Sequence, residues 1–131
     1  MKINSLKRAL KVAKEIFGNK ESIKDLFNET ESKAANNKDR IESGLWYDLK
    51  MLKSMLKAWL SGSYKFSKRT ILYVIAGMLY FVSPVDMIPD MILGLGFIDD
   101  AAVLALVVKR IKGELEKYKE STHFQNAEVL S

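Results

Sequence analysis

The sequence predicts an all-α protein of about five helices, with a central apolar helical hairpin joined by a turn rich in proline and aspartate. Three observations favour this fold class. Only 2 prolines and 7 glycines occur in 131 residues, too few for the many tight turns of an all-β chain. Apolar residues recur at intervals of three and four positions along most of the chain. The length is sufficient for one domain with a single modest core.

The first 40 residues are expected to form basic amphipathic helices followed by a polar linker. The apolar face of the first helix consists of Ile3, Leu6, Leu10, Ala13 and Phe17. Charged residues interrupt the segment between Ile3 and Phe17, so it has no continuous apolar stretch like that of a secretory signal sequence. A short second pattern at Ile23, Leu26 and Phe27 is expected to pack against the first helix. The stretch from Glu29 to Arg40 has no Leu, Val, Ile or aromatic residue and is predicted to be a mobile linker or loop.

Residues 41–120 are expected to form the main helical domain, and residues 121–131 a flexible tail. Its first helix has apolar residues at near-heptad spacing, namely Ile41, Leu45, Leu49, Leu52, Leu56 and Leu60. The hairpin, residues 65–119, follows. It consists of an apolar helix from about Lys65 to Val82 and a last helix from about Asp100 to Lys119.

Charge is unevenly distributed along the chain. From Thr70 to Val108, 28 of 39 residues are apolar, none is Lys or Arg, and four aspartates give a charge of −4. Because the formal charge of the whole chain is +5, the other 92 residues carry +9. A basic amphipathic sequence therefore surrounds an apolar block whose only charges are carboxylates.

The length of this block leaves two arrangements open. Thr70–Val85 is an uncharged stretch of 16 residues, about 24 Å of helix, whereas a bilayer core is about 30 Å thick. In one arrangement the block is a hairpin that enters the membrane, with its basic flanks on the cytoplasmic side. These flanks are Lys65, Lys68, Arg69, Lys109, Arg110 and Lys112. In the other, which length alone favours, the block is the buried centre of a soluble bundle covered by the amphipathic helices.

Three interpretations are open for the aspartates of the turn. They can cap or begin helices, since Asp86 follows Ser83-Pro84 as in a capping box and a helix N-terminus favours carboxylates. They can contact a partner protein. They can also bind one Mg²⁺ or Ca²⁺ ion, because these cations prefer oxygen ligands. The metal hypothesis uses Asp86, Asp90, Asp99 and Asp100.

The same segment resembles the YkvA-like family, a domain of unknown function described as an uncharacterised membrane protein. The resemblance is carried by Tyr80, Pro84, Asp86, Ile88, Pro89, Asp90, Gly94, Gly96, Asp99 and Asp100. It extends from about Asp48 to Glu120 and does not include residues 1–40. It implies a membrane-associated helical hairpin and supplies no reaction, substrate or cofactor. Together with the segment lengths, it favours a short or re-entrant hairpin with an acidic turn.

The sequence predicts no catalytic residues, so we expect neither an enzyme nor a cofactor nor a small-molecule substrate. There is no cysteine, and the single histidine, His123, lies in the tail. The pI of about 9.3 permits contact with phosphate, but no nucleic-acid recognition module is present, so no nucleic acid is expected.

The predicted function is that of a non-catalytic membrane-associated protein. The basic faces of residues 2–17 and 109–119 are expected to favour anionic lipid headgroups. A homo-oligomer or a protein partner is left open. The alternative is a cytoplasmic, soluble helical bundle that acts as a protein-interaction module, with or without a Mg²⁺ or Ca²⁺ site at the aspartate turn.

Overall fold

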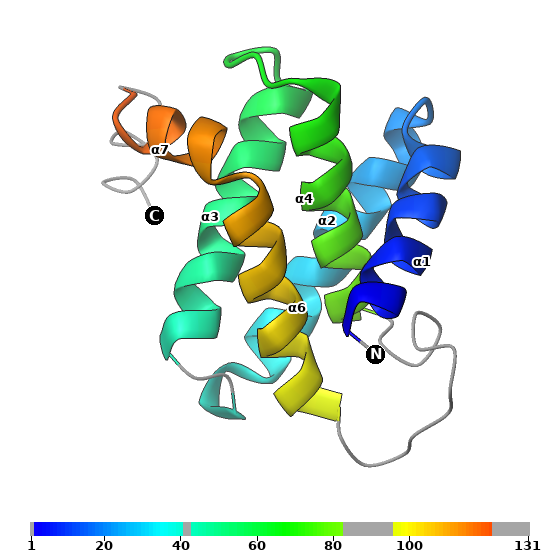
Figure 1. The fold of residues 1–131 in the computed structure, drawn as a ribbon, viewed down its shortest axis with the longest axis vertical. Helices are drawn as coiled ribbons and strands as arrows, with labels where there is room; N and C mark the ends of the chain where they lie inside the picture. Colours follow the sequence, from blue (N-terminus) through cyan, green and yellow to red (C-terminus); the bar gives the residue numbers. More distant parts are fainter. Residues whose placement is uncertain (1, 41–42, 83–95, 122–131) are drawn as a thin grey trace.

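The structure is a computed structural model that describes residues 2–40, 43–82 and 96–121. Within these residues the chain forms six α-helices, one short 3₁₀ helix and no strand, which confirms the all-α prediction. The elements are α1 (Lys2–Ile16), α2 (Lys20–Asn36), η1 (Lys38–Arg40), α3 (Ser43–Leu60), α4 (Lys68–Val82), α6 (Gly96–Arg110) and α7 (Lys112–Lys119). Figure 1 shows α4 in the middle of the bundle, with α1, α2, α3 and α6 around it.

Helix α4 is the buried centre of the fold. From Thr70 to Phe81, all of its residues except Tyr73 and Leu79 are buried. It packs most extensively against α1, and also contacts α2, α3 and α6. This is the position expected of a helix that is apolar all round. The other helices cover α4, as expected for the arrangement in which the apolar block is the buried centre of a bundle.

The apolar faces predicted for the neighbouring helices point toward this centre. In α1, Leu6, Ala9 and Ala13 are buried, and Leu10 and Phe17 pack at the edge of the core. In α3, four of the predicted stripe residues are buried: Leu45, Leu49, Leu52 and Leu56. In the last predicted helix, four of the apolar residues at helical spacing are buried, namely Leu104, Ile111, Leu115 and Tyr118, and the fifth, Val108, is partly buried.

The prediction of a mobile linker from Glu29 to Arg40 is wrong for most of its length. Residues 29–36 continue helix α2, and residues 38–40 form the 3₁₀ helix η1. The buried face here consists of Thr30 and Ala34, which take the positions where larger apolar residues stand in the other helices. The prediction of a linker relied on the absence of large apolar side chains. Small residues such as Ala34, or a threonine whose hydroxyl is hydrogen-bonded, can occupy the buried face of a helix as well.

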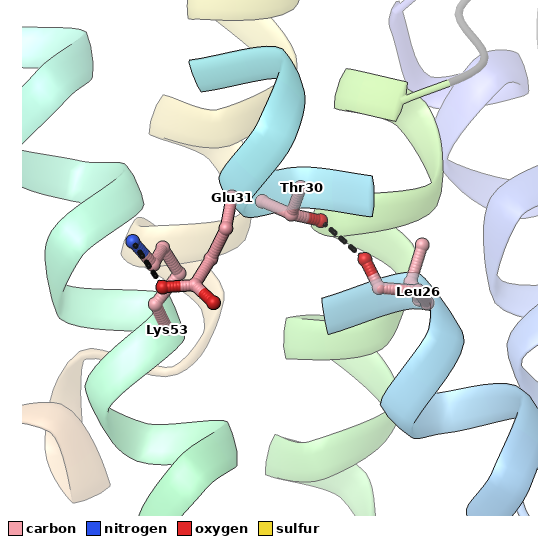
Figure 2. Close-up of polar contacts among 4 residues, drawn as sticks. All are labelled: Leu26, Thr30, Glu31 and Lys53. Atoms are coloured by element: carbon pink, nitrogen blue, oxygen red, sulfur yellow. Dashed lines mark hydrogen bonds and ion pairs between the residues drawn. The ribbon is translucent and has the colours of Figure 1, made fainter. Parts of the chain in front are cut away.

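Two polar contacts hold this part of α2 in place (Figure 2). The hydroxyl of Thr30, fully buried, donates a 2.8 Å hydrogen bond to the carbonyl oxygen of Leu26 one turn earlier. Glu31 points to the other side and pairs with Lys53 of α3, with 3.4 Å between Oε2 and Nζ. The ion pair is partly exposed and contributes little, so the burial of Thr30 and Ala34 fixes the helix.

The hairpin helices differ in their bounds from the prediction. The apolar helix begins at Lys68, not at Lys65, and the last predicted helix is two helices, α6 and α7. The direction of the chain changes at Ile111, which has φ −108° and ψ 15°. This break gives six α-helices among the described residues instead of about five. The predicted division into residues 1–40, 41–120 and 121–131 stays a prediction.

Candidate functional site

Most of the predicted turn motif lies outside the residues that the structure describes. This group consists of Pro84, Asp86, Ile88, Pro89, Asp90 and Gly94. Tyr80 lies in α4 and is 1% exposed, so it belongs to the core. Gly96 is the first residue of α6, and Asp99 and Asp100 follow in the same helix, with their side chains outside the described set.

The hypothesis of a metal centre at the turn stays untested. Among the side chains that the structure does describe, no group of three or more His, Cys, Asp or Glu residues is placed to hold a metal ion. The four aspartates of the hypothesis were not among them. Their interpretations as helix caps, as a partner contact or as cation ligands therefore stay predictions.

At the end of α4 that borders the turn, Lys33 of α2 contacts the last helical turn. Its Nζ donates a 2.5 Å hydrogen bond to the carbonyl oxygen of Phe81 and lies 5.1 Å from the centroid of that ring. The last turn of α4 contains no basic residue of its own. Because the carbonyls at a helix C-terminus lack intrahelical partners and favour a cation, Lys33 stabilises this end of α4. Sequence reasoning missed this contact because it assigned Lys33 to a linker.

At the other end of α4, Glu114 of α7 binds the N-cap residue Ser67. Its Oε1 accepts a 2.9 Å hydrogen bond from the Ser67 backbone N–H, and its Oε2 accepts one of 2.7 Å from the hydroxyl. The same hydroxyl oxygen accepts from the N–H of Thr70 at 3.2 Å. Since the first turn of α4 has no acidic residue, Glu114 supplies the negative charge that a helix N-terminus favours.

The two basic flanks of the predicted hairpin meet at this end. Nη1 of Arg69 donates a 3.1 Å hydrogen bond to the carbonyl oxygen of Arg110, and its guanidinium lies 4.9 Å from the ring centroid of Tyr73. The start of α4 and the end of α6 are therefore neighbours. The side of a membrane that these flanks face stays a prediction.

A groove of about 400 Å³ lies between α3 and the α6–α7 region. Its floor includes the buried side chains of Met51 and Leu115. Tyr47, 45% exposed, lies on one wall. The charged lining consists of Asp48, Lys109, Lys112, Glu116 and Lys119. The sequence pattern gave no signal for this groove, because its walls come from segments far apart in the chain.

Within the groove, Asp48 and Lys119 influence each other. Burial raises the pKa of the Asp48 carboxyl, and the nearby Lys119 ammonium lowers it in part. A hydrogen bond with Tyr47 is the main cause that raises the pKa of Lys119, whose Nζ lies 5.3 Å from the centroid of that ring. The groove thus holds a cation beside a carboxyl group that is partly desolvated.

The family comparison concerns the buried centre of this bundle. Residues 70–106 match the family model described as a protein of unknown function (DUF1232). A protein of Bacillus subtilis (strain 168), named uncharacterized membrane protein YkvA, is 54% identical over 67 residues. The aligned part is 50% of this chain and 63% of that relative. The resemblance to the YkvA-like family is confirmed.

The DUF1232 match begins within the first turn of α4 and ends in α6, at Leu106. It therefore includes the central helix and the antiparallel neighbour that packs against it, while α1, α2 and α3 lie outside it. No solved structure matches the chain. In the part of the chain that the structure describes, no helix combines the length and the apolar character needed to cross a membrane.

Proposed function

We propose that this chain is a non-catalytic, membrane-associated helical bundle that attaches to a lipid surface while α4 stays covered by the other helices. The observation that carries the proposal is the burial of α4. The membrane part rests on the name of the B. subtilis relative, which calls that protein a membrane protein. Membrane localisation, with the basic flanks on the cytoplasmic side of the membrane, is part of the proposal, and a cytoplasmic location is its alternative.

The packing of α4 favours attachment over insertion. Val74, Ile75 and Met78 are each 0% exposed and lie among side chains of the surrounding helices. Moving α4 into lipid requires α1, α2 and α3 to leave it and to expose their own apolar faces. Burial of a single large apolar side chain is worth about 1.5–3 kcal/mol, so separating the helices costs many times that amount.

The lengths of the helices also favour attachment. Helices α4 and α6 have 15 residues each, about 22 Å by the rise of an α-helix, and a bilayer core is about 30 Å thick. In addition, α6 ends with Lys109 and Arg110, and α4 begins with Lys68 and Arg69. The uncharged part of each helix is therefore shorter still.

A short or re-entrant hairpin of α4 and α6 is the second candidate. One observation favours it: α4 carries no charged residue after Arg69, and it is the most apolar of the described helices. In this mode the two helices separate from α1, α2 and α3 and enter the lipid together. The acidic turn is then placed inside the membrane or at its far side.

The proposal assigns no reaction to the chain. The sequence has no cysteine and a single histidine, and no arrangement of catalytic side chains was identified in it. A protein partner or a second copy of the chain is compatible with this proposal, since either can act together with a lipid surface.

Fractionation of cells that express the chain tests the proposal. We expect the protein to sediment with membranes in low-salt lysate and to be released by alkaline carbonate or high salt. Recovery entirely in the low-salt supernatant contradicts membrane association. Retention in the carbonate-washed membranes contradicts attachment and supports the hairpin.

Single cysteines distinguish the two membrane modes directly, because the chain has none of its own. A Val74→Cys variant places the thiol in the centre of α4, and an Asn36→Cys variant places it at the exposed end of α2. In membrane-bound protein, we expect the thiol at position 74 to resist both water-soluble and lipid-soluble maleimides while the thiol at position 36 reacts. Labelling of position 74 by the lipid-soluble reagent alone supports the hairpin.

A further inference from the structure

At one end of the bundle, one terminal turn from each of the six described α-helices lies close to the others, and each of these turns carries at least one basic residue. Helices α1, α3 and α6 end there, and α2, α4 and α7 begin there, at the upper end in Figure 1. Phe17 after α1 packs against Trp59 of α3, with ring centroids 5.5 Å apart, and Lys68 Nζ lies 5.2 Å from the Phe17 centroid. We define the basic end as these six terminal turns with residues 17–19, 61–67 and 111.

The basic end carries nine exposed cations and three carboxylates. The cations are Lys14, Lys20, Lys57, Lys65, Lys68, Arg69, Lys109, Arg110 and Lys112. The carboxylates are Glu15, Glu21 and Glu114, and the last is bound to Ser67. The net charge of this end, +6, exceeds that of the whole chain, +5.

Helix dipoles explain only part of this charge. Lys14, Lys57, Lys109 and Arg110 lie in last turns, where a cation is favourable. Four other cations lie in first turns, where the partial charge of the helix is positive and a cation is unfavourable. They are Lys20, Lys68, Arg69 and Lys112. Contacts of Lys68 with Phe17 and of Arg69 with Tyr73 offset part of this cost, and a negatively charged partner at this end would offset the rest.

Aromatic side chains lie among these cations. Phe17, Trp59, Tyr64 and Tyr73 are all partly exposed. Trp and Tyr with Lys and Arg at one level form the combination that is enriched where proteins meet the membrane–water interface. A nucleic acid also attracts lysines, but Phe17, Trp59 and Tyr73 already contact another ring or a cation, and stacking on bases would compete with these contacts.

The opposite end differs in charge. The last turn of α4 has no basic residue, and Lys33 beside it is engaged with the carbonyl oxygen of Phe81. The other cations at this end are Lys2 at the start of α1 and Lys38 and Arg40 of η1, and the sequence places Asp39, Asp99 and Asp100 there as well, so this end carries much less positive charge than the basic end. The charge of the bundle is therefore asymmetric along the axis of α4.

We propose that the basic end is the surface that docks on an anionic lipid bilayer, with the start of α4 toward the membrane and its end away from it. This inference rests on the proposed function, since it specifies how the bundle attaches. The cations bind lipid headgroups, and the partly exposed aromatic residues lie at the headgroup level.

Two triple variants with the same change of charge test the location of the surface. One replaces three exposed lysines of the basic end, Lys57→Gln, Lys65→Gln and Lys112→Gln; the other, its control, replaces three exposed lysines elsewhere, Lys38→Gln, Lys50→Gln and Lys117→Gln. Binding is measured with vesicles of phosphatidylglycerol and phosphatidylcholine in equal parts. Each well-placed lysine contributes about fivefold, so we expect the first variant to bind at least roughly tenfold more weakly and the control to change by less than about threefold.

The two tryptophans report the orientation independently of these variants. Trp59 lies in the last turn of α3 at the basic end, and Trp46 lies in its first turn, about 20 Å away by the helical rise. Trp46→Phe leaves Trp59 as the only tryptophan, and Trp59→Phe leaves Trp46. With brominated lipid in the same vesicles, we expect quenching of Trp59 and little quenching of Trp46.

The outcomes separate this inference from the proposed function. No binding of the unmodified chain to anionic vesicles, with no membrane sedimentation in cells, contradicts the proposed function itself. Binding that both triple variants weaken equally, or stronger quenching of Trp46 than of Trp59, overturns the docking surface while membrane association stands. Binding that is as strong to pure phosphatidylcholine as to the mixed vesicles overturns the electrostatic basis of the inference.

Discussion

The carboxylate of Glu114 accepts two hydrogen bonds from Ser67, one from the backbone N–H and one from the hydroxyl, at 2.9 and 2.7 Å. This pair joins α7 to the start of α4. It places a negative charge where α4 has none of its own and leaves Ser67 in the geometry of an N-cap. A residue outside the DUF1232 match thus stabilises the helix with which the match begins.

Replacement of Glu114 is expected to destabilise the fold through the start of α4. We expect Glu114→Ala to lower the free energy of unfolding by about 1–2 kcal/mol, because Ser67 loses two acceptors and the helix loses a favourable charge. Urea denaturation measures this change. Glu116→Ala on the same helix is the control, since Glu116 is exposed, and should change the stability by less than about 0.5 kcal/mol. Equal effects of the two substitutions contradict the role of Glu114.

Removal of the Lys33 ammonium tests the contact at the other end of α4. In Lys33→Met the apolar part of the side chain remains and the hydrogen bond to the Phe81 carbonyl is lost. We expect a loss of about 1–2 kcal/mol in the free energy of unfolding, measured by denaturation. The matched control is Lys24→Met, an exposed lysine on the same helix. A stability equal to that of the unmodified chain shows that α4 does not depend on this contact.

Thr30 tests whether the segment predicted as a linker is part of the core. We expect Thr30→Asp to lower the free energy of unfolding by at least about 2 kcal/mol, because it buries a carboxylate at a position that is 0% exposed. Asn28→Asp, at an exposed position of the same helix, introduces the same charge and should have little effect. If thermal unfolding of both variants matches that of the unmodified chain, residues 29–36 do not pack as described.

The sequence was sufficient to predict those features that depend on local periodicity. The stripe Leu45, Leu49, Leu52 and Leu56 predicted α3 and its buried face, and the uncharged run after Arg69 predicted the central helix. Both signals depend on large apolar side chains at helical spacing. The second half of α2 lacks them, because Thr30 and Ala34 form its buried face, and there the same reasoning failed.

Contacts between distant parts of the chain could not be predicted in this way. Ser67 and Glu114 meet only because α7 turns back after Ile111, and Asp48 meets Lys119 for the same reason. The candidate turn was recognised from its prolines and aspartates. Its geometry lies outside the described residues, so the roles of Asp86, Asp90, Asp99 and Asp100 stay predictions.

Gly77 is expected to tolerate only the smallest side chain. A Cβ atom at this position would lie 3.1 Å from Cδ2 of Leu104 and 3.4 Å from Cδ1 of Leu52. Alanine gains about 1 kcal/mol of helix propensity, which offsets a small shift of these flexible groups, so we expect Gly77→Ala to be within about 1 kcal/mol of neutral. Gly77→Leu should cost more than about 3 kcal/mol, since α3 and α6 must move apart.

The control for Gly77 is Gly113, which lies in α7 with open space around it. Gly113→Leu is expected to leave the stability unchanged or to raise it, because leucine favours a helix more than glycine does. Denaturation of the unmodified chain and these three variants compares the two sites. A similar response of Gly77→Leu and Gly113→Leu contradicts the close packing of α4 against α3 and α6.

The partly buried carboxyl of Asp48 is expected to make the stability of the fold depend on pH. Burial raises the pKa of its carboxyl in the folded state above the usual 3.8, so the folded chain holds this proton more tightly than the unfolded chain does. The protonated carboxyl therefore favours the folded state at low pH, and the free energy of unfolding decreases as the pH rises through the raised pKa. We expect Asp48→Asn to be more stable than the unmodified chain at neutral pH, with a difference that disappears below the ordinary carboxyl range. Asp25→Asn, at an exposed position of α2, is the control. A difference between Asp48→Asn and the unmodified chain that is constant from acid to neutral pH contradicts the desolvation of this carboxyl.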